Sequence, residues 1–370
     1  MKRAALGLIS ATVLATATLT ACATGNVPAS ATVTASLANG LTDRSYPVLV
    51  DGSGPRGDEL TDIGPAWNVT LPLLEAGPIA VAGNGKFAYV LQDSGITVIS
   101  GVNTAHPRVL PTTLDRDANS ANAIVITPSG NYAYVSENVD NPPGTLPVTA
   151  NVVTVYSGVS TGRLKLTATV PIAADLLPFL FLATSSDGKY VYVAGETSTG
   201  MSLTQLTSVS NGHPKVAWTR SLRIAPGSMT LTPNGKFLYF NGAKSLSIVK
   251  VGATGVTVVS TFSFRGAPQG MITPNGAYAY ESYGDDNVQV LSDAQASPRK
   301  DGIIRPPDGA RMVTAQPSGQ YAYALMSRWP FPADTGTVVA LSGTASDHLK
   351  AAATWKLSYA PAYIAVSPAG

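Results

Sequence analysis

The chain has 370 residues, enough for one large domain or two ordinary ones. Charged residues make up 12% and apolar residues 45% of the chain, which excludes a largely disordered protein. No run of about 18 or more apolar residues occurs after the N-terminus, so the body is not a bundle of membrane helices. The single cysteine excludes an intrachain disulfide, and the 35 glycines and 27 prolines favour an all-β protein with many turns.

The N-terminus has the layout of a secretory signal peptide. Lys2 and Arg3 form a short positive region, and a mildly apolar segment over residues 4–18 follows them. Residues 19–22, Leu-Thr-Ala-Cys, resemble a bacterial lipobox, in which Cys22 receives the lipid and becomes the first mature residue. We therefore expect an exported protein that is anchored in the bacterial cell envelope by acyl chains such as palmitate on Cys22. Ordinary secretion with an incidental cysteine is the alternative.

We expect three parts in the chain: a signal peptide over residues 1–21, the lipidated cysteine with a flexible tether over residues 22–43, and a folded body over residues 44–370. When Lys2 and Arg3 leave with the signal peptide, 22 basic residues face 22 acidic residues, so the mature chain is formally neutral. A neutral body lacks the basic surface that nucleic-acid binding requires, and we expect no nucleic-acid partner.

The body repeats one unit, which consists of an apolar strand, a Pro/Ser-x-Gly turn and a Tyr-x-Tyr strand. One copy is IVITPSGNYAYV over residues 124–135. Proline presets φ at the first turn position, and glycine accepts the positive φ that the turn needs. The turn glycines recur at spacings between 41 and 58 residues, which is the size of a four-stranded propeller blade. They are Gly85, Gly130, Gly188, Gly235, Gly276, Gly319 and Gly370.

Each blade is predicted to have four strands, a to d, with strand d outermost. In one blade these are residues 124–128, 132–135, 152–158 and 164–172. Both tyrosines of a Tyr-x-Tyr strand point to one face, where they can fill the wedge against the next blade. His106, His213 and His348 all fall at the turn between strands c and d, in three different blades. We therefore expect these histidines to be structural and not to converge on a metal or a base.

The seven turn glycines predict a seven-bladed β-propeller. The seventh copy stops at Gly370, directly after strand a, so we expect N-terminal strands to close the last blade. The candidates are residues 45–51 and 67–73, the latter as strand d. No Tyr-x-Tyr strand b occurs there, which leaves two alternatives: an incomplete last blade or a truncated sequence.

The repeat resembles the YVTN-type β-propeller repeat, which lactonase-like propellers and bacterial surface-layer proteins share. The best matches are DGKYVYV over residues 187–193 and PNGKFLY over residues 233–239, and the resemblance runs from about Pro78 to the end. The Thr-Asn tail of the motif is missing, because Leu91-Gln92 and Ala194-Gly195 stand in its place in two copies. The resemblance implies a propeller fold and, by analogy of fold alone, a lactonase-like activity.

Ligand contacts are expected on the face formed by the b–c and d–a loops. Carboxylates there could act as a base or ligate Ca²⁺, and arginines could hold a carboxylate or phosphate of a ligand. No other cofactor is expected. Solvated loop tips are the alternative for all of these residues. The candidates are Glu137, Glu196 and Glu281 as catalytic or metal-binding groups, and Arg265, Arg311, Arg328 and Trp329 as ligand-binding groups.

Two functions are compatible with this sequence. The first is an interaction module of the cell envelope that binds a protein, peptide or glycan, since no nucleophile elbow and no plausible catalytic triad occur. The alternative is a lactonase-like hydrolase that uses the loop-face carboxylates, with or without a divalent metal. An enzyme needs these side chains to converge, whereas a binding module needs only an exposed patch, expected around Trp329. A structural spacer without a ligand is a third alternative.

Overall fold

A computed structural model of the chain describes residues 48–54, 57–62, 67–71, 77–92, 95–104, 106–111, 113–114, 118–140, 149–172, 180–224, 227–265, 269–283, 287–304, 310–316, 318–326, 336–344, 349–357 and 360–366. The chain divides into the compact units Met1–Thr32 and Val33–Gly370, and every described residue lies in the second. The expected signal peptide and tether lie outside the described residues, so their boundaries stay predictions. Within these ranges no helix is long and apolar enough to span a membrane.

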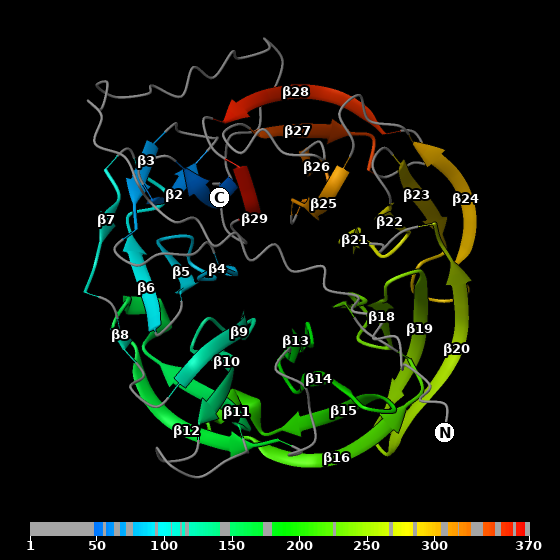
Figure 1. Cartoon of the computed structure of the whole chain (residues 1–370), viewed down its shortest axis with the longest axis horizontal. Coiled ribbons are helices and arrows are strands. Elements are labelled where there is room, and N and C mark those ends of the chain that lie inside the picture. The colour runs from blue at the N-terminus through cyan, green and yellow to red at the C-terminus, as the bar shows by residue number, and fades with distance from the viewer. Residues whose placement is uncertain are drawn as a thin grey trace, which may run out of the picture. The chain divides into compact units, whose positions relative to one another are not determined.

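The strands form antiparallel sheets that follow one another around a ring (Figure 1). In the described part of the chain there are six four-stranded sheets and one five-stranded sheet. We number these blades 1 to 7, starting at β4. Blade 1 consists of β4 (Ile79–Val81), β5 (Phe87–Gln92), β6 (Gly95–Ser100), β7 (Arg108–Val109) and β8 (Thr113–Leu114). Blade 2 consists of β9 (Ala118–Ile126), β10 (Tyr132–Asp140), β11 (Thr149–Ser157) and β12 (Lys165–Pro171). Blade 3 consists of β13 (Leu180–Thr184), β14 (Val191–Thr197), β15 (Gly200–Thr207) and β16 (Lys215–Leu222).

Blades 4 to 6 repeat this order. Blade 4 consists of β17 (Ser228–Leu231), β18 (Phe237–Asn241), β19 (Ser245–Gly252) and β20 (Gly255–Ser263). Blade 5 consists of β21 (Gln269–Ile272), β22 (Tyr278–Tyr283), β23 (Asn287–Ser292) and β24 (Arg299–Ile304). Blade 6 consists of β25 (Ala310–Ala315), β26 (Tyr321–Met326), β27 (Gly336–Ser342) and β28 (Lys350–Leu357). Two 3-10 turns, η1 (Val159–Thr161) and η2 (Val209–Asn211), join strands c and d in blades 2 and 3. The prediction of an all-β propeller with four-stranded antiparallel blades is confirmed.

The last blade is closed by N-terminal strands, as predicted. Its sheet has the order β29-β1-β2-β3, with β29 (Ala360–Val366), β1 (Val48–Gly54), β2 (Gly57–Asp62) and β3 (Trp67–Thr70). β1 pairs antiparallel with β29, from Val48 opposite Val366 to Ser53 opposite Ala360. β1 therefore takes the place of strand b without a Tyr-x-Tyr motif. The alternative of an incomplete last blade is wrong, because this sheet has all four strands.

The a–b turns form where the repeat predicts them. Gly130, Gly188 and Gly235 have φ between 67° and 69°, a conformation that glycine adopts without the cost a side chain would bring. The residue before each turn is usually Thr or Ser, and its side chain bonds back to the strand that follows. Thr232 Oγ1, for example, accepts the N–H of Phe237 at 3.0 Å. This contact fixes the turn before the Tyr-x-Tyr strand begins.

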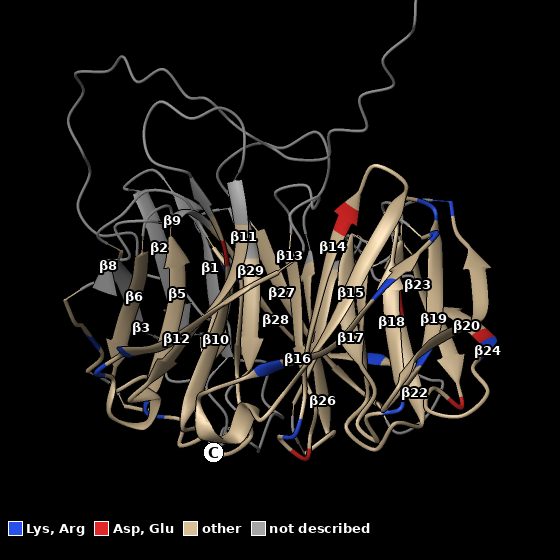
Figure 2. Cartoon of the chain, turned by 90° about the horizontal axis from the view of Figure 1, so that it is seen from below, with Lys and Arg blue, Asp and Glu red and all other residues tan. Residues whose placement is uncertain are grey.

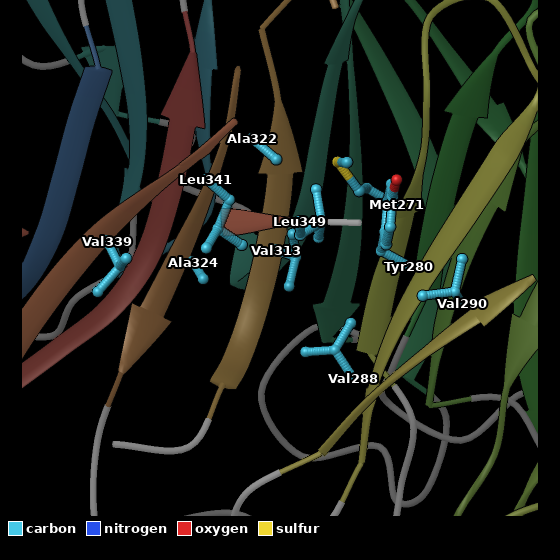
Figure 3. Packing of buried hydrophobic residues seen from close by; sticks show 10 residues of the cluster. All are labelled: Met271, Tyr280, Val288, Val290, Val313, Ala322, Ala324, Val339, Leu341 and Leu349. Carbon is cyan, nitrogen blue, oxygen red and sulfur yellow. The ribbon is translucent and has the colours of Figure 1, made fainter. Parts of the chain in front are cut away.

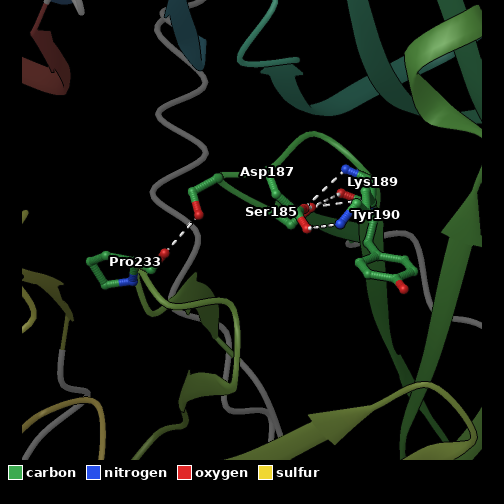
Figure 4. A network of polar contacts seen from close by, with 6 residues as sticks. Ser185, Asp187, Lys189, Tyr190 and Pro233 are labelled. Carbon is green, nitrogen blue, oxygen red and sulfur yellow. Dashed lines mark hydrogen bonds and ion pairs between the residues drawn. The ribbon is translucent and has the colours of Figure 1, made fainter.

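The same turn in blade 3 also reaches the neighbouring blade (Figure 4). Ser185 Oγ donates to Asp187 Oδ1 at 2.7 Å and accepts the N–H of Tyr190 at 2.9 Å. Ser186 Oγ donates to the carbonyl oxygen of Pro233, in the next blade's turn, at 2.6 Å. The Ser185 hydrogen bond lowers the pKa of Asp187. The turn motif thus shapes one blade and also ties it to the next.

The hydrophobic core lies in the seams between blades. Each of the seven clusters of buried side chains found among the described residues joins two consecutive blades. Figure 3 shows the seam between blades 5 and 6, where Tyr280 and Val290 of one blade lie opposite Val313 and Leu341 of the other. Burial of these apolar surfaces is the main favourable term that holds the ring together.

The tyrosines of a Tyr-x-Tyr strand contact the c–d turn of the next blade. Tyr134 is fully buried, and its hydroxyl donates to the carbonyl oxygen of Val209 in η2 at 2.7 Å. Tyr132 lies against Gly212, which ends the same turn, so closely that a Cβ on Gly212 would overlap the ring. We call this pair of contacts the tyrosine clasp. The expectation that these tyrosines pack between blades is confirmed. The equivalent hydrogen bonds run from Tyr89 to Val159, from Tyr239 to Ala294 and from Tyr280 to Thr344.

Charged side chains lie mainly at the turns and on the outer strands, and the inner strands have few (Figure 2). The outer strand of blades 2 to 6 also carries a register shift at one equivalent place, for example between Val155 and Tyr156 in β11 opposite β12. Such bulges and charges on an edge strand oppose pairing with other chains.

The clasp can be tested on two glycines with nearly equal backbone conformation. Gly212 and Gly235 have φ of 73° and 68°, but a Cβ on Gly235 would meet nothing within 4 Å. Gly235→Ala should therefore cost only the strain of the left-handed conformation, about 1–2 kcal/mol. Gly212→Ala should cost roughly 1–3 kcal/mol more, because it also displaces Tyr132. Urea unfolding of both variants measures the difference, and equal losses would show that the close contact between Tyr132 and Gly212 contributes nothing to stability.

Candidate functional site

The three candidate glutamates lie at the ends of strand b in three different blades. Glu137 is in β10, Glu196 in β14 and Glu281 in β22, whereas we expected all three in the b–c loops. The expectation is wrong in this respect, because these strands continue well beyond their Tyr-x-Tyr motifs. Glu137 and Glu281 are buried, with 2% and 1% of their surface exposed, and Glu196 is half-buried. Two of the candidates are therefore parts of the blade interior rather than solvated loop tips.

Glu137 is held by a hydroxyl from the adjacent strand. Thr154 Oγ1, in β11, donates to Glu137 Oε2 at 2.5 Å. Blade 1 has the same arrangement with an uncharged group, because Thr97 Oγ1 donates to Gln92 Oε1 at 2.6 Å. Gln92 and Glu137 occupy the same repeat position, three residues after the second aromatic of the motif. A glutamine is therefore compatible with the fold at this position, and the ionisable carboxyl group of Glu137 is a property that blade 1 lacks.

A row of asparagines lies beside Glu137 but on the other face of the same sheet. Asn138 Nδ2 donates to Asn151 Oδ1 at 2.9 Å, and Asn122 Nδ2 donates to Asn138 Oδ1. Asn138 and Asn151 are buried, and Asn122 is half-buried. Because side chains alternate along a strand, Asn138 faces the seam opposite to the one that Glu137 faces. The sequence signal for these residues is the presence of amides in otherwise apolar strands, whereas the predicted site residues were all placed in loops.

Glu281 lies in the seam between blades 4 and 5. It is opposite Gly270 of β21 in its own sheet, and a Cβ on Gly270 would overlap its carboxylate. Its Oε2 is buried and has no hydrogen-bond partner. Burial raises the pKa of Glu281 to about 8, and contact with the Asn241 amide opposes part of this shift. The absence of Cβ at residue 270 is what allows a carboxyl group to fit here.

The remaining candidates contribute less to the described site. Arg265 is exposed in the connection between blades 4 and 5. Arg311 lies in β25, but its side chain is outside the description, and Arg328, Trp329 and Cys22 lie outside the described residues altogether. His106 and His213 are exposed at c–d turns, where they were expected, and His348 also lies outside the description.

Metal binding by these carboxylates stays a prediction. Among the described residues, no group of three or more His, Cys, Asp and Glu side chains is placed to hold a metal ion. A Ca²⁺ site would need six to eight oxygen ligands, so it would require main-chain and amide oxygens as well.

Part of the chain matches a known family. Residues 79–212 match the family model described as "Lactonase, 7-bladed beta-propeller". The resemblance to lactonase-like propellers that the repeat predicts is confirmed over this segment, which runs from β4 to the end of η2. The segment contains Glu137 and Glu196, whereas Glu281, Arg265 and Arg311 lie beyond it. No match was found among curated proteins.

Solved structures resemble this propeller over most of its length. They include a putative 6-phosphogluconolactonase from Bacteroides uniformis, with a TM-score of 0.69 and 14% identity over 88% of this chain and 100% of that chain. A functionally unknown protein from Desulfotomaculum acetoxidans has a TM-score of 0.66 and 14% identity, over 88% of this chain and 99% of that chain. The periplasmic gluconolactonase of Pseudomonas aeruginosa has a TM-score of 0.61 and 12% identity, over 88% of this chain and 99% of that chain. At these identities the likeness shows the fold alone.

Proposed function

We propose that this protein hydrolyses a sugar lactone on the face formed by the b–c and d–a connections, with Glu137 as the general base. The observation that carries the proposal is the position of Glu137, a buried and oriented carboxylate inside the segment that matches the lactonase family. The gluconolactonase and the putative 6-phosphogluconolactonases that share this fold suggest gluconolactone, with or without a phosphate, as the substrate class.

The chemistry needs one positioned carboxylate. Glu137 would take a proton from a water molecule whose oxygen attacks the lactone carbonyl carbon. The ring C–O bond then breaks, the ring oxygen receives the proton, and the product is the open hydroxy acid. Burial removes Glu137 from bulk water, so its charge acts on a bound substrate through a low effective dielectric. Thr154 fixes the direction of one carboxylate oxygen.

A phosphorylated lactone would need a cation on the same face. Arg265 and Arg223 are exposed in the d–a connections that follow blades 4 and 3. A guanidinium group binds a phosphate through two parallel hydrogen bonds, so either residue could select the phosphorylated substrate.

Glu137→Gln tests the proposal without disturbing the blade, because Gln92 already occupies the equivalent place in blade 1. The variant should unfold at the wild-type temperature but lose about 100-fold or more in kcat/KM, since glutamine cannot accept the proton. Hydrolysis of glucono-δ-lactone and of its 6-phosphate, followed by acid release, measures the effect. Glu196→Gln, which removes an equal charge from a half-buried position, is the control.

Two results would contradict the proposal. Wild-type protein that hydrolyses neither lactone would exclude this function and would favour the interaction module expected from the sequence. Equal activity of Glu137→Gln and wild type would exclude Glu137 as the base. The interaction module itself stays a prediction, because Arg328 and Trp329 lie outside the described residues.

We also propose that the protein is exported and held at the membrane of the cell envelope by lipid on Cys22. The support is the Leu-Thr-Ala-Cys sequence after the apolar segment. In cells grown with labelled palmitate, the wild type should carry label and enter the detergent phase, because two or more acyl chains give stable attachment. Cys22→Ser should be unlabelled and remain in the aqueous phase. The same distribution for both proteins would contradict the proposal.

A further inference from the structure

Glu281 is a buried carboxyl group in the seam between blades 4 and 5, outside the segment that carries the proposed activity. It is 1% exposed, and its Oε2 has no hydrogen-bond partner. An ionised carboxylate in such a place loses its hydration without compensation. The group therefore needs either a counter-ion, a donor or a proton.

Asn241, at the end of β18 in the neighbouring blade, contacts this carboxyl group. It is also 1% exposed. Its Nδ2 donates to Ser228 Oγ at 3.0 Å, and its Oδ1 has no partner. Both unpartnered atoms, Glu281 Oε2 and Asn241 Oδ1, are acceptors when the carboxyl group is ionised. An ionised Glu281 would thus leave two buried oxygens without donors in one seam.

We propose that Glu281 is a neutral carboxylic acid in the folded protein and that its O–H donates to Asn241 Oδ1 across the seam. The second N–H of Asn241 is then available to the other oxygen of the carboxyl group. The result is a two-point pair between acid and amide that gives both unpartnered oxygens a hydrogen bond without any net charge. One proton therefore links blade 4 to blade 5, and its loss breaks the link.

The surroundings offer little to neutralise a charge instead. In the same sheet, β21 and β23 carry no charged residue, and neither does β18, the strand of blade 4 that holds Asn241. On the side of blade 6, β25 carries one charged residue, Arg311, whose side chain lies outside the described residues. From blade 4, Tyr239 faces Glu281, and its hydroxyl is engaged by the carbonyl oxygen of Ala294 at 2.5 Å. A cation would also need more oxygen ligands than this carboxyl and amide supply.

The linkage to pH follows from the two states of Glu281. Its pKa is raised from 4.5 to about 8 on folding, mainly by burial. Below about pH 4.5 the group is neutral in both states, and its contribution to stability is fully present. As the pH rises towards 8, only the unfolded chain ionises, so each pH unit can raise the unfolding equilibrium constant by up to tenfold. Above about pH 8 the loss is complete.

Urea unfolding of the full-length protein between about pH 5 and pH 9.5 tests the proposed pair between protonated Glu281 and Asn241. We expect the midpoint of the wild type to fall as the pH rises to about 8. Glu281→Gln should remove that slope and unfold at a higher midpoint at high pH, because the amide pairs with Asn241 at every pH. Glu196→Gln, the charge control, should keep the wild-type slope. Identical slopes for wild type and Glu281→Gln would overturn the proposal.

Infrared spectroscopy tests the proton directly and does not depend on a variant that folds. Wild-type protein at neutral pH should show a carboxylic C=O band that disappears as the pH passes about 8 and that Glu281→Gln lacks. Absence of this band in the wild type at neutral pH would overturn the proposal. A rise in the wild-type midpoint on addition of Ca²⁺ or Na⁺, absent in Glu281→Gln, would also overturn it, because Glu281 would then be an ionised cation ligand.

Discussion

The contact between the strand-b tyrosine of one blade and the c–d turn of the next is the constraint on which the rest of the ring depends. A buried tyrosine contributes a large apolar surface, but its hydroxyl must find a partner. In this propeller the partner is a carbonyl oxygen of the neighbouring blade, as in the bond from Tyr134 to Val209. Burial raises the pKa of the Tyr134 hydroxyl, so the group is protonated and donates this bond at neutral pH. Packing and hydrogen bonding thus fix the same two blades in one register.

Blade 3 shows what happens when the receiving turn is missing. The c–d connection of blade 4 is a tight hairpin from Gly252 to Gly255 and forms no 3-10 turn. Tyr192 therefore has no carbonyl oxygen to reach in the next blade, and its hydroxyl instead accepts a hydrogen bond from Gln205 of its own blade at 3.0 Å. The seam between blades 3 and 4 is held by apolar packing, to which Trp218 and Leu238 contribute, and by hydrogen bonds outside the tyrosine strand, such as that from Ser186 to Pro233. The length of one turn decides whether a seam has a clasp.

Much of this architecture could be predicted from local patterns. The Pro/Ser-x-Gly turns and the Tyr-x-Tyr strands follow from φ preferences, which act within a few residues. The closure by N-terminal strands follows from the repeat itself, whose seventh copy stops after strand a. The site could be predicted only in part. Glu281 and Asn241 are 40 positions apart and meet because two blades pack face to face, which no local pattern encodes. The burial of Glu137 was not predicted either. The sequence analysis placed this residue in a loop, whereas strand β10 continues past the last apolar residue of its motif and includes it.

The seams place polar groups where function could use them. Glu137 and Glu281 both lie in strand b, and both are almost completely buried. One has a hydroxyl donor from Thr154, and the other has an unpartnered oxygen. Glu137 follows the second motif tyrosine by three residues and Glu281 follows it by one, so the same strand of the repeat holds a hydroxyl-bonded carboxyl group in one blade and a carboxyl group with an unpartnered oxygen in another. The difference comes from the neighbouring strands and not from the glutamates themselves.

The stability of clasp variants tests this account most directly. Tyr134→Phe and Tyr239→Phe each remove one cross-blade hydrogen bond, in the seams between blades 2 and 3 and between blades 4 and 5. Each should lower the free energy of unfolding by about 1–2 kcal/mol, because a buried carbonyl oxygen is left without its donor. The double variant should lose the sum of the two, since the seams are separate. Unchanged stability in all three variants would contradict the claim that the cross-blade tyrosine hydrogen bonds stabilise the ring.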